Sequence, residues 1–443
     1  MGTELILVVV LVTLVVLLVI EVPVAFCLAG SGVLGLVLLR GTNVAGATLA
    51  SLPFQATSSF TLTVVPMFIL MGMFAMQANV AEDLFRLTNR ALKFLRGGAA
   101  VATIVTCAGF AAVCGSSVAT AATVGRLTIG EMKRYGFSGG FAGALVASAG
   151  TLGVMIPPSI ALVLFGIISN ESIGALLMAG IIPGIVSAVI MAIGVLVLAR
   201  FGYGYDAAAA DRAVEDTPPG AASRSYGGIV RLGILFIIVI GGIYSGVITA
   251  TEAAAIGAMA SLIMLLISVL RRQLAFAPAI REALSGTASL TSMVFAILVG
   301  ASIFSYFLVS AGVPGDFADW VLGFDLPPSL LVLLMLASLI PLGMILDGVS
   351  IQLITVPLFY PVVVTELGFD GLWYAILTVK MIELGLITPP VGVNAFIVSN
   401  LVGRGGLEQV FRSLTVFVVI DLIIFGVLFA FPGIVTWLPA QMN

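Results

Sequence analysis

The sequence predicts an all-α membrane protein that crosses the bilayer many times. Of its 443 residues, 61% are hydrophobic and 9% are charged, whereas soluble domains are about 25% charged. The mean hydropathy is +1.25. A soluble fold cannot hide that much apolar surface, because most of a folded surface meets water. The 50 glycines agree with closely packed or broken membrane helices.

The composition also excludes several classes of function. The sequence has no histidine, which rules out an imidazole base, a histidine metal ligand and a haem. Its three cysteines are too few and too scattered for a disulfide framework. A net charge of −3 without a basic cluster excludes nucleic acid as a partner. We expect no organic cofactor. Residues 1–20 lack the basic region and cleavage site of a signal peptide, so we expect them to remain as a helix.

The spanning helices are predicted from apolar segments of about 20 residues. The candidates lie near 4–20, 22–39, 62–78, 139–169, 174–199, 229–248, 253–270, 285–312, 371–402 and 410–432. Two of them, 139–169 and 371–402, contain Pro-Pro and are therefore predicted to be broken helices. Ala81–Leu95 places leucines between charges, which is typical of an amphipathic helix at the membrane interface.

Two further apolar blocks are predicted to be re-entrant helical hairpins. Residues 98–130 are interrupted at Gly115-Ser116-Ser117, and residues 329–364 are interrupted at Asp347-Gly348. Each arm is short for a full crossing, so we expect each block to enter and leave the membrane on the same side.

The distribution of basic residues predicts the orientation. With this set of spans, one side collects fifteen Lys and Arg residues and the other collects Arg40 alone. The basic side is expected to be cytoplasmic. Both termini and the second hairpin should therefore face the periplasm, and the first hairpin and the 201–228 linker should face the cytoplasm.

An internal repeat divides the chain into two halves. The segment Gly153–Pro158 recurs 232 residues later as Gly385–Pro390, and the same offset superimposes the two hairpin breaks. We therefore expect a first repeat at 1–200 and a second at 229–443. Each has five crossings and one hairpin, and an odd number of crossings inverts the second repeat. Inverted repeats with broken helices are the architecture of secondary transporters.

The Pro-Pro breaks suggest a site that binds an ion or a substrate. Proline has no N–H, so Pro157-Pro158 should free the carbonyls of Gly153 and Val154, and Pro389-Pro390 those of Gly385 and Leu386. Freed carbonyls with a nearby hydroxyl suit a desolvated sodium ion. The alternative is a simple kink whose gap is filled by neighbouring helices. Because the break occurs in two symmetric copies, we favour an ion or substrate site.

Charged residues inside apolar segments are costly and often functional. We favour a place in the substrate cavity for Asp347, at the second hairpin tip. Lys380 and Glu383 are three residues apart on one helix and are spaced to neutralise each other. Arg126 is equally consistent with helix anchoring and with attraction of a substrate. Asp421 has no assigned role.

Six segments resemble the large membrane subunit of tripartite ATP-independent periplasmic (TRAP) transporters. They are Cys114–Gly125, Gly130–Phe137, Thr151–Ser159, Ala179–Gly184, Tyr244–Ala255 and Glu383–Asn394. The resemblance implies an elevator-type transporter of the bacterial inner membrane that imports organic acids, such as dicarboxylates, sugar acids or sialic acids, with a sodium gradient. It also implies a periplasmic binding protein and a small four-helix membrane subunit, which we expect to be a separate chain.

The resemblance further implies two sodium sites and a substrate cavity. The first sodium site would use Ser116, Ser117, Gly153, Ile156 and Pro158. The second would use Gly348, Gly385, Thr388 and Val391. The cavity is predicted near Asp347, Ser350, Thr120, Asn394 and Arg126. Val349 and Lys380 depart from the residue types expected at their positions, and neither identifies the substrate.

Two other functions compete with this interpretation. One is an autonomous sodium- or proton-coupled carboxylate carrier or antiporter, which would need no partner proteins. The other is an intramembrane enzyme, which the lack of histidine and of a Ser-Lys or paired-aspartate motif disfavours.

Overall fold

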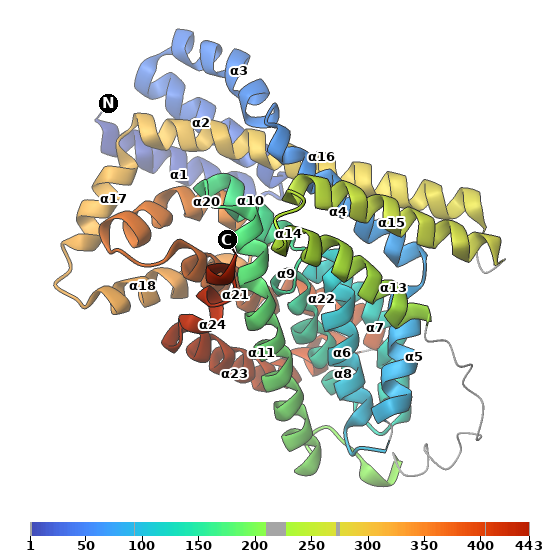
Figure 1. Ribbon diagram of the computed structural model, residues 1–443. Helices are drawn as coiled ribbons and strands as arrows, with labels where there is room; N and C mark the ends of the chain where they lie inside the picture. Colours follow the sequence, from blue (N-terminus) through green and yellow to red (C-terminus); the bar gives the residue numbers. More distant parts are fainter. Residues whose placement is uncertain (1, 93, 210–226, 272–274, 404, 443) are drawn as a thin grey trace.

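The structure is a computed structural model that describes residues 2–92, 94–209, 227–271, 275–403 and 405–442. Figure 1 shows that these residues are almost entirely helical. Among them, the isolated β-bridge between Phe137 and Tyr205 is the one trace of strand structure. The all-α prediction is therefore confirmed.

The first half consists of helices joined by short connections. In chain order they are α1 (Thr3–Val19), α2 (Val24–Arg40), α3 (Thr42–Thr57), α4 (Val64–Gln77), α5 (Val80–Leu92), α6 (Gly98–Cys114), α7 (Ser117–Arg134), α8 (Gly139–Gly150), α9 (Leu152–Met155), α10 (Ile160–Ser169) and α11 (Ile173–Arg200). A 3₁₀ turn at Phe60–Thr63 leads into α4. Helix α5 is the predicted amphipathic helix, and it buries Leu84 and Phe85.

The second half follows after residue 226. Its helices are α13 (Gly227–Phe236), α14 (Gly242–Tyr244), α15 (Ala250–Leu270), α16 (Phe276–Ser310), α17 (Val313–Leu322), α18 (Pro328–Ala337), α19 (Leu339–Gly343), α20 (Gly348–Tyr360), α21 (Gly371–Ile387), α22 (Val393–Val402), α23 (Gly406–Ala430) and α24 (Gly433–Thr436). Single π-helical turns follow α13 and α20. Most of the predicted 201–228 linker, residues 210–226, lies outside the described residues. So do five basic residues of the orientation argument, namely Lys93, Arg212, Arg224, Arg272 and Arg404.

Both predicted hairpins are interrupted where the sequence indicates. Helix α6 ends at Cys114 and α7 begins at Ser117, and the two helices pack on each other. In the second block, α19 ends at Gly343 and α20 begins at Gly348. The break is longer than predicted, because Met344–Asp347 all lie outside a helix. The side of the membrane to which each pair opens stays a prediction.

Both Pro-Pro segments break their helices as predicted. The axis bends by 45° between Gly139–Met155 and Ile160–Ser169. Helix α21 ends at Ile387, and α22 begins only at Val393. The Pro157-Pro158 and Pro389-Pro390 peptide bonds are both cis. The breaks thus occur at corresponding positions, whereas the inverted arrangement of the two halves stays a prediction.

The lengths of the spans differ from the prediction. Within the described residues, six helices are long and apolar enough to cross a membrane, or seven if α8–α10 count as one broken span. Helices α1 and α2 have only 17 residues each. Helix α16 has 35 residues and begins well before the predicted residue 285. Helices α3 and α17 were not expected, since their sequences mix polar and apolar residues.

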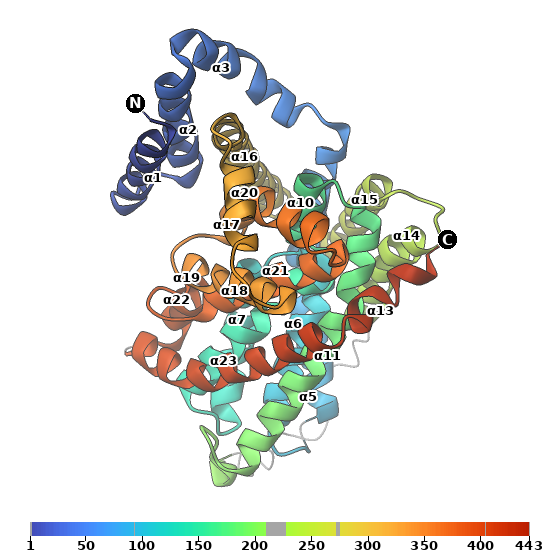
Figure 2. The same ribbon diagram turned by 90° about the vertical axis from the view of Figure 1, so that its left-hand side faces the viewer.

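Small residues allow the helices to pack closely. An added Cβ at Gly32 of α2 would lie 2.8 Å from the Phe304 Cα of α16, and one at Gly300 of α16 would lie 2.2 Å from the Ala25 carbonyl oxygen. These contacts explain why α16 runs along α2 (Figure 1). Figure 2 shows α23 crossing α11. Helix α8 packs against α7, α22 and α23, so both halves of the chain build the same buried centre.

Candidate functional site

The first hairpin tip packs directly on the first broken helix. Gly115 follows the last residue of α6 and lies in the left-handed region, with φ of 66°. An added Cβ there would lie 2.8 Å from the Pro158 carbonyl oxygen, so no larger residue fits. The Gly115 carbonyl also accepts a hydrogen bond of 3.3 Å from the Ile160 N–H. The tip is therefore fixed against the Pro-Pro break.

Gly153 brings three predicted residues together. An added Cβ at Gly153 would lie 2.7 Å from both the Ser116 carbonyl oxygen and the Thr120 hydroxyl. The Thr120 hydroxyl is buried and has no hydrogen-bond partner among the described residues. Ile156 and Pro158 are buried in the same region. Oxygen atoms of the hairpin tip thus lie against the glycine of the break, and the Ser116 carbonyl also accepts a hydrogen bond of 3.0 Å from the Thr120 N–H. The first sodium site itself stays a prediction.

The second hairpin packs on α21 through a glycine that the sequence analysis missed. An added Cβ at Gly385 would lie 2.7 Å from the Gly343 Cα. Gly348, the predicted partner, instead faces Ile382, whose Cγ2 would lie 3.3 Å from a Cβ at Gly348. Gly343 stands four residues before the tip, and a small residue in an otherwise leucine-rich arm is the signal that could have identified it.

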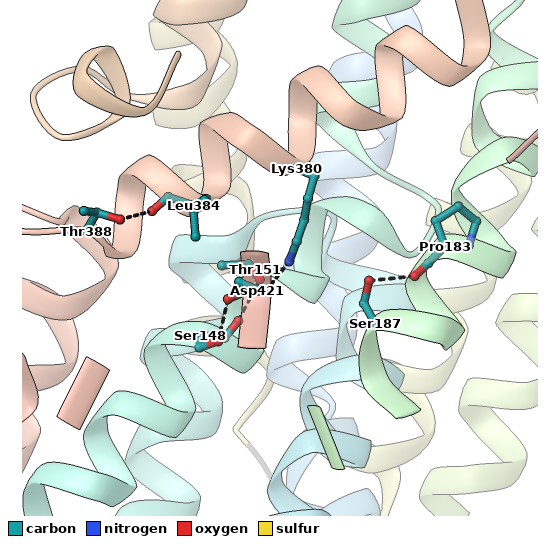
Figure 3. Close-up of polar contacts among 8 residues, drawn as sticks. All are labelled: Ser148, Thr151, Pro183, Ser187, Lys380, Leu384, Thr388 and Asp421. Atoms are coloured by element: carbon teal, nitrogen blue, oxygen red, sulfur yellow. Dashed lines mark hydrogen bonds and ion pairs between the residues drawn. The ribbon is translucent and has the colours of Figure 1, made fainter. Parts of the chain in front are cut away.

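The second break frees fewer backbone groups than predicted. The Gly385 carbonyl is not free, because the Thr388 N–H donates to it at 3.0 Å. The Thr388 hydroxyl donates to the Leu384 carbonyl at 2.6 Å, as Figure 3 shows. The helix tightens its last turn and satisfies these groups itself. Val391 is 46% exposed and Pro389 and Pro390 are also exposed, whereas the corresponding first-half residues are buried.

Asp347 caps a helix. It is the N-cap of α20, and its Oδ1 accepts hydrogen bonds of 3.1 Å from the backbone N–H groups of Val349 and Ser350. Its Oδ2 accepts a hydrogen bond from the Ser350 hydroxyl. These contacts explain why a carboxylate stands at the hairpin tip. The predicted role of Asp347 and Ser350 in a substrate cavity stays a prediction.

The other predicted cavity residues lie on α7 and α22, which pack on each other. Asn394 lies in the first turn of α22 and is fully buried, and neither polar atom of its side chain has a hydrogen-bond partner among the described residues. Arg126 is exposed on α7, about 9 Å along the helix axis from Thr120. A cavity of about 440 Å³ lies elsewhere, between α3 and Tyr306, and none of the predicted residues lines it.

Lys380 does not pair with Glu383, contrary to the prediction. Its ammonium group forms an ion pair with Asp421 of α23, and both side chains are fully buried. The other Asp421 oxygen, Oδ2, accepts a hydrogen bond of 2.8 Å from the Ser148 hydroxyl of α8. Figure 3 shows these side chains converging from three helices. The reason for the difference is that α23 presents an acid to α21, which the spacing within one helix cannot reveal.

Glu383 instead forms a hydrogen bond between the two halves of the chain. Its Oε1 accepts a hydrogen bond of 3.1 Å from the hydroxyl of Ser117, at the start of α7. Its Oε2 is buried without a hydrogen-bond partner among the described residues. Ser117, predicted to bind sodium in the first half, therefore points its hydroxyl to an acid of the second half.

Comparisons with known proteins agree with the all-helical fold. A solved structure of the YdaH transporter of Alcanivorax borkumensis matches with a TM-score of 0.64 and 13% identity, covering 88% of this chain and 90% of that one. At that identity, it shows the fold alone.

Two relatives are informative in sequence. The C4-dicarboxylate TRAP transporter large permease protein DctM of Pseudomonas aeruginosa is 34% identical over 379 residues, which are 84% of each chain. The isethionate TRAP transporter permease protein DctMQ of Oleidesulfovibrio alaskensis is 33% identical over 96% of this chain and 64% of its own length. Both are transporter permeases rather than enzymes. The family model for the DctM component of tripartite ATP-independent periplasmic transporters matches residues 11–434. The chain therefore belongs to the DctM family and is a multi-span membrane protein of TRAP transporters.

Proposed function

We propose that this protein is the transport subunit for sodium-coupled import of an organic acid across the bacterial inner membrane. A periplasmic binding protein would deliver the substrate, and a small membrane subunit would complete the complex. The family model describes a tripartite periplasmic transporter, which supports the two partners. The two relatives carry C4-dicarboxylate and isethionate in their names, and both compounds are small organic anions.

The observation that carries the sodium proposal is the contact between the first hairpin tip and the first broken helix. There the Ser116 carbonyl and the Thr120 hydroxyl, which has no hydrogen-bond partner among the described residues, lie against the buried Gly153. Unwound backbone oxygens and hydroxyls are the ligands by which broken helices hold sodium. In the second half, the Thr388 hydroxyl and the carbonyls around Gly385 would serve in the same way, although some of these groups also bond to one another.

An organic anion would bind near the second break. Helix α22 begins at Val393, just after the exposed segment 389–391, and a helix start carries a partial positive charge. Asn394, in its first turn, has side-chain amide atoms without a partner in the described part of the chain, and these would bind a carboxylate or a sulfonate. In the elevator that we propose, the hairpins and broken helices would move together against α2, α4, α15 and α16.

The test is uptake into proteoliposomes that contain the complete complex. The ligand of the binding protein is first identified by its thermal stabilisation with C4-dicarboxylates, sugar acids, sialic acids and sulfonates. Uptake of that labelled compound is then measured under an inward gradient of sodium, potassium or protons. We expect uptake with sodium alone, and only with the binding protein present. Equal uptake with potassium or protons would contradict sodium coupling, and robust uptake by the lone chain would favour an autonomous carrier.

A further inference from the structure

The buried charges of the protein do not balance. Among the described residues, the buried side chains that carry a formal charge are Lys380, Asp421 and Glu383. Lys380 and Asp421 form an ion pair with each other. Glu383 is left as one negative charge with no cation of its own. An isolated ionised carboxylate is very costly in a medium of low dielectric constant, so it needs a counter-ion or a proton.

The carboxylate of Glu383 lies near the starts of two helices. Ser117, which donates to Oε1, is the first residue of α7, and Gly348, the first residue of α20, lies near the same oxygen. A Cβ at Gly348 would lie 4.0 Å from Oε1. The carboxylate thus faces the starts of two helices, where the partial positive charge stabilises an anion.

The unused oxygen indicates where a cation would bind. Glu383 is only 4% exposed, and Oε2 has no donor within the described part of the chain. A purely structural carboxylate in such a position would be expected to have a donor at each oxygen. Neighbouring helices instead leave Oε2 free at the meeting point of the two hairpin tips.

We propose that Glu383 binds a monovalent metal cation, sodium in the working transporter, through Oε2. This cation would be additional to those at the two Pro-Pro breaks, whose ligands are neutral oxygens. Glu383 would supply a full negative charge, and a cation bound there would bridge the first and second hairpin tips. The inference rests on the proposed sodium coupling and adds an anionic ligand to it.

Equilibrium binding of radioactive sodium to the purified complex tests this directly. The variants are Glu383→Gln, which keeps the size and removes the charge, and Glu366→Gln, an exposed control. We expect Glu366→Gln to bind as the wild type does and Glu383→Gln to bind one sodium ion fewer per chain. The same number of ions with the same affinity in Glu383→Gln would overturn the proposal while leaving sodium coupling intact.

A second variant covers the case in which Glu383→Gln does not fold. Glu383→Asp keeps the charge but withdraws it by one methylene, so we expect the same number of ions and an affinity about tenfold weaker for one of them. Unchanged affinity in Glu383→Asp would also overturn the proposal. If the wild type binds no sodium, the proposed function fails. The measurement is then repeated with labelled rubidium as a potassium analogue, and a wild type that binds neither ion excludes a cation at Glu383.

Discussion

Gly153 lies where the first hairpin tip and the first broken helix are in contact. A methyl group there would approach the Ser116 carbonyl and the Thr120 hydroxyl to 2.7 Å, which is shorter than such contacts allow. We expect Gly153→Ala to lower the stability by about 1–3 kcal/mol through overpacking. It should also weaken sodium binding, because the tip must move away from the break.

Gly130 provides the matched control for this substitution. It lies on α7, and nothing would be within 4 Å of its added Cβ. Gly130→Ala should be neutral or slightly stabilising, since alanine is the better helix former. Thermal melting of the purified complex, with and without sodium, measures both variants. A Gly153→Ala protein with the melting temperature and sodium response of the wild type would show that the contact is not tight.

Asp347 offers a test that separates helix capping from transport. Asparagine caps helices about as well as aspartate, whereas alanine does not. We expect Asp347→Asn to keep the wild-type melting temperature and Asp347→Ala to lose about 1 kcal/mol of stability. If Asp347 also lines the substrate cavity, Asp347→Asn should slow uptake in proteoliposomes. Uptake kinetics that match the wild type in Asp347→Asn would restrict the residue to its capping role.

The sequence predicts contacts well where a motif carries them. The resemblance placed Ser116 and Gly153 in one site, and the structure brings them together. It could not predict the partner of Lys380, because Asp421 lies 41 residues away on another helix. The same holds for Glu383 and Ser117, which are 266 residues apart. The spacing of residues along the sequence predicts contacts within one helix. Buried charged side chains here contact residues of other helices, which that spacing does not reveal.

At the scale of the elements, the buried ion pair holds three helices together. Lys380 lies on α21, Asp421 on α23 and Ser148 on α8. We expect Lys380→Met to destabilise the protein by about 3–5 kcal/mol, because Asp421 would remain as an unpaired buried charge. The double variant Lys380→Met/Asp421→Asn should recover most of this loss. Thermal melting of the purified protein measures both.

An exposed ion pair is the control for the buried one. Arg86 and Glu82 pair on the surface of α5 at 2.5 Å, and Arg86→Met should cost at most about 1 kcal/mol. If Lys380→Met were as mild as Arg86→Met, the buried pair would not be holding the helices. If the double variant were as unstable as Lys380→Met, loss of packing rather than the unpaired charge would be the cause.

Helix breaks were easier to predict than helix lengths. Proline and glycine act locally, so Pro157-Pro158 and Gly115 mark their breaks directly. The tightening of the last turn of α21 at Thr388 could not be predicted, because a helix end can satisfy its own carbonyls in several ways. Helix α3 was not predicted, because its mixture of polar and apolar residues gives no continuous apolar segment.

At the scale of the whole molecule, the fold class follows from composition, but the topology requires the distribution of charge. Apolar content alone indicates a membrane protein, and the motifs identify the family. Which end of each helix faces the cytoplasm depends on a few arginines and lysines at the loops. The inverted relation of the two halves rests on that same orientation. An experiment on the sidedness of two loops therefore tests both predictions.

The loops after α11 and after α17 are predicted to lie on opposite sides of the membrane. Ala208 and Asp325 are both exposed, and the native cysteines Cys27, Cys107 and Cys114 are all buried. We expect Asp325→Cys to react with an impermeant maleimide added outside spheroplasts, because its loop should be periplasmic. Ala208→Cys should react only after the membrane is permeabilised.

Permeabilised spheroplasts and the unsubstituted protein are the controls for this experiment. Both cysteine variants must react after permeabilisation, and the unsubstituted protein should not react at all, since burial shields its thiols. Reaction of Ala208→Cys from outside, with Asp325→Cys protected, would reverse the orientation while keeping an odd number of crossings between the two loops. Reaction of both from outside would require an even number of crossings. That result would contradict the three crossings predicted between the two loops, at 229–248, 253–270 and 285–312, and with them the predicted arrangement of the second repeat.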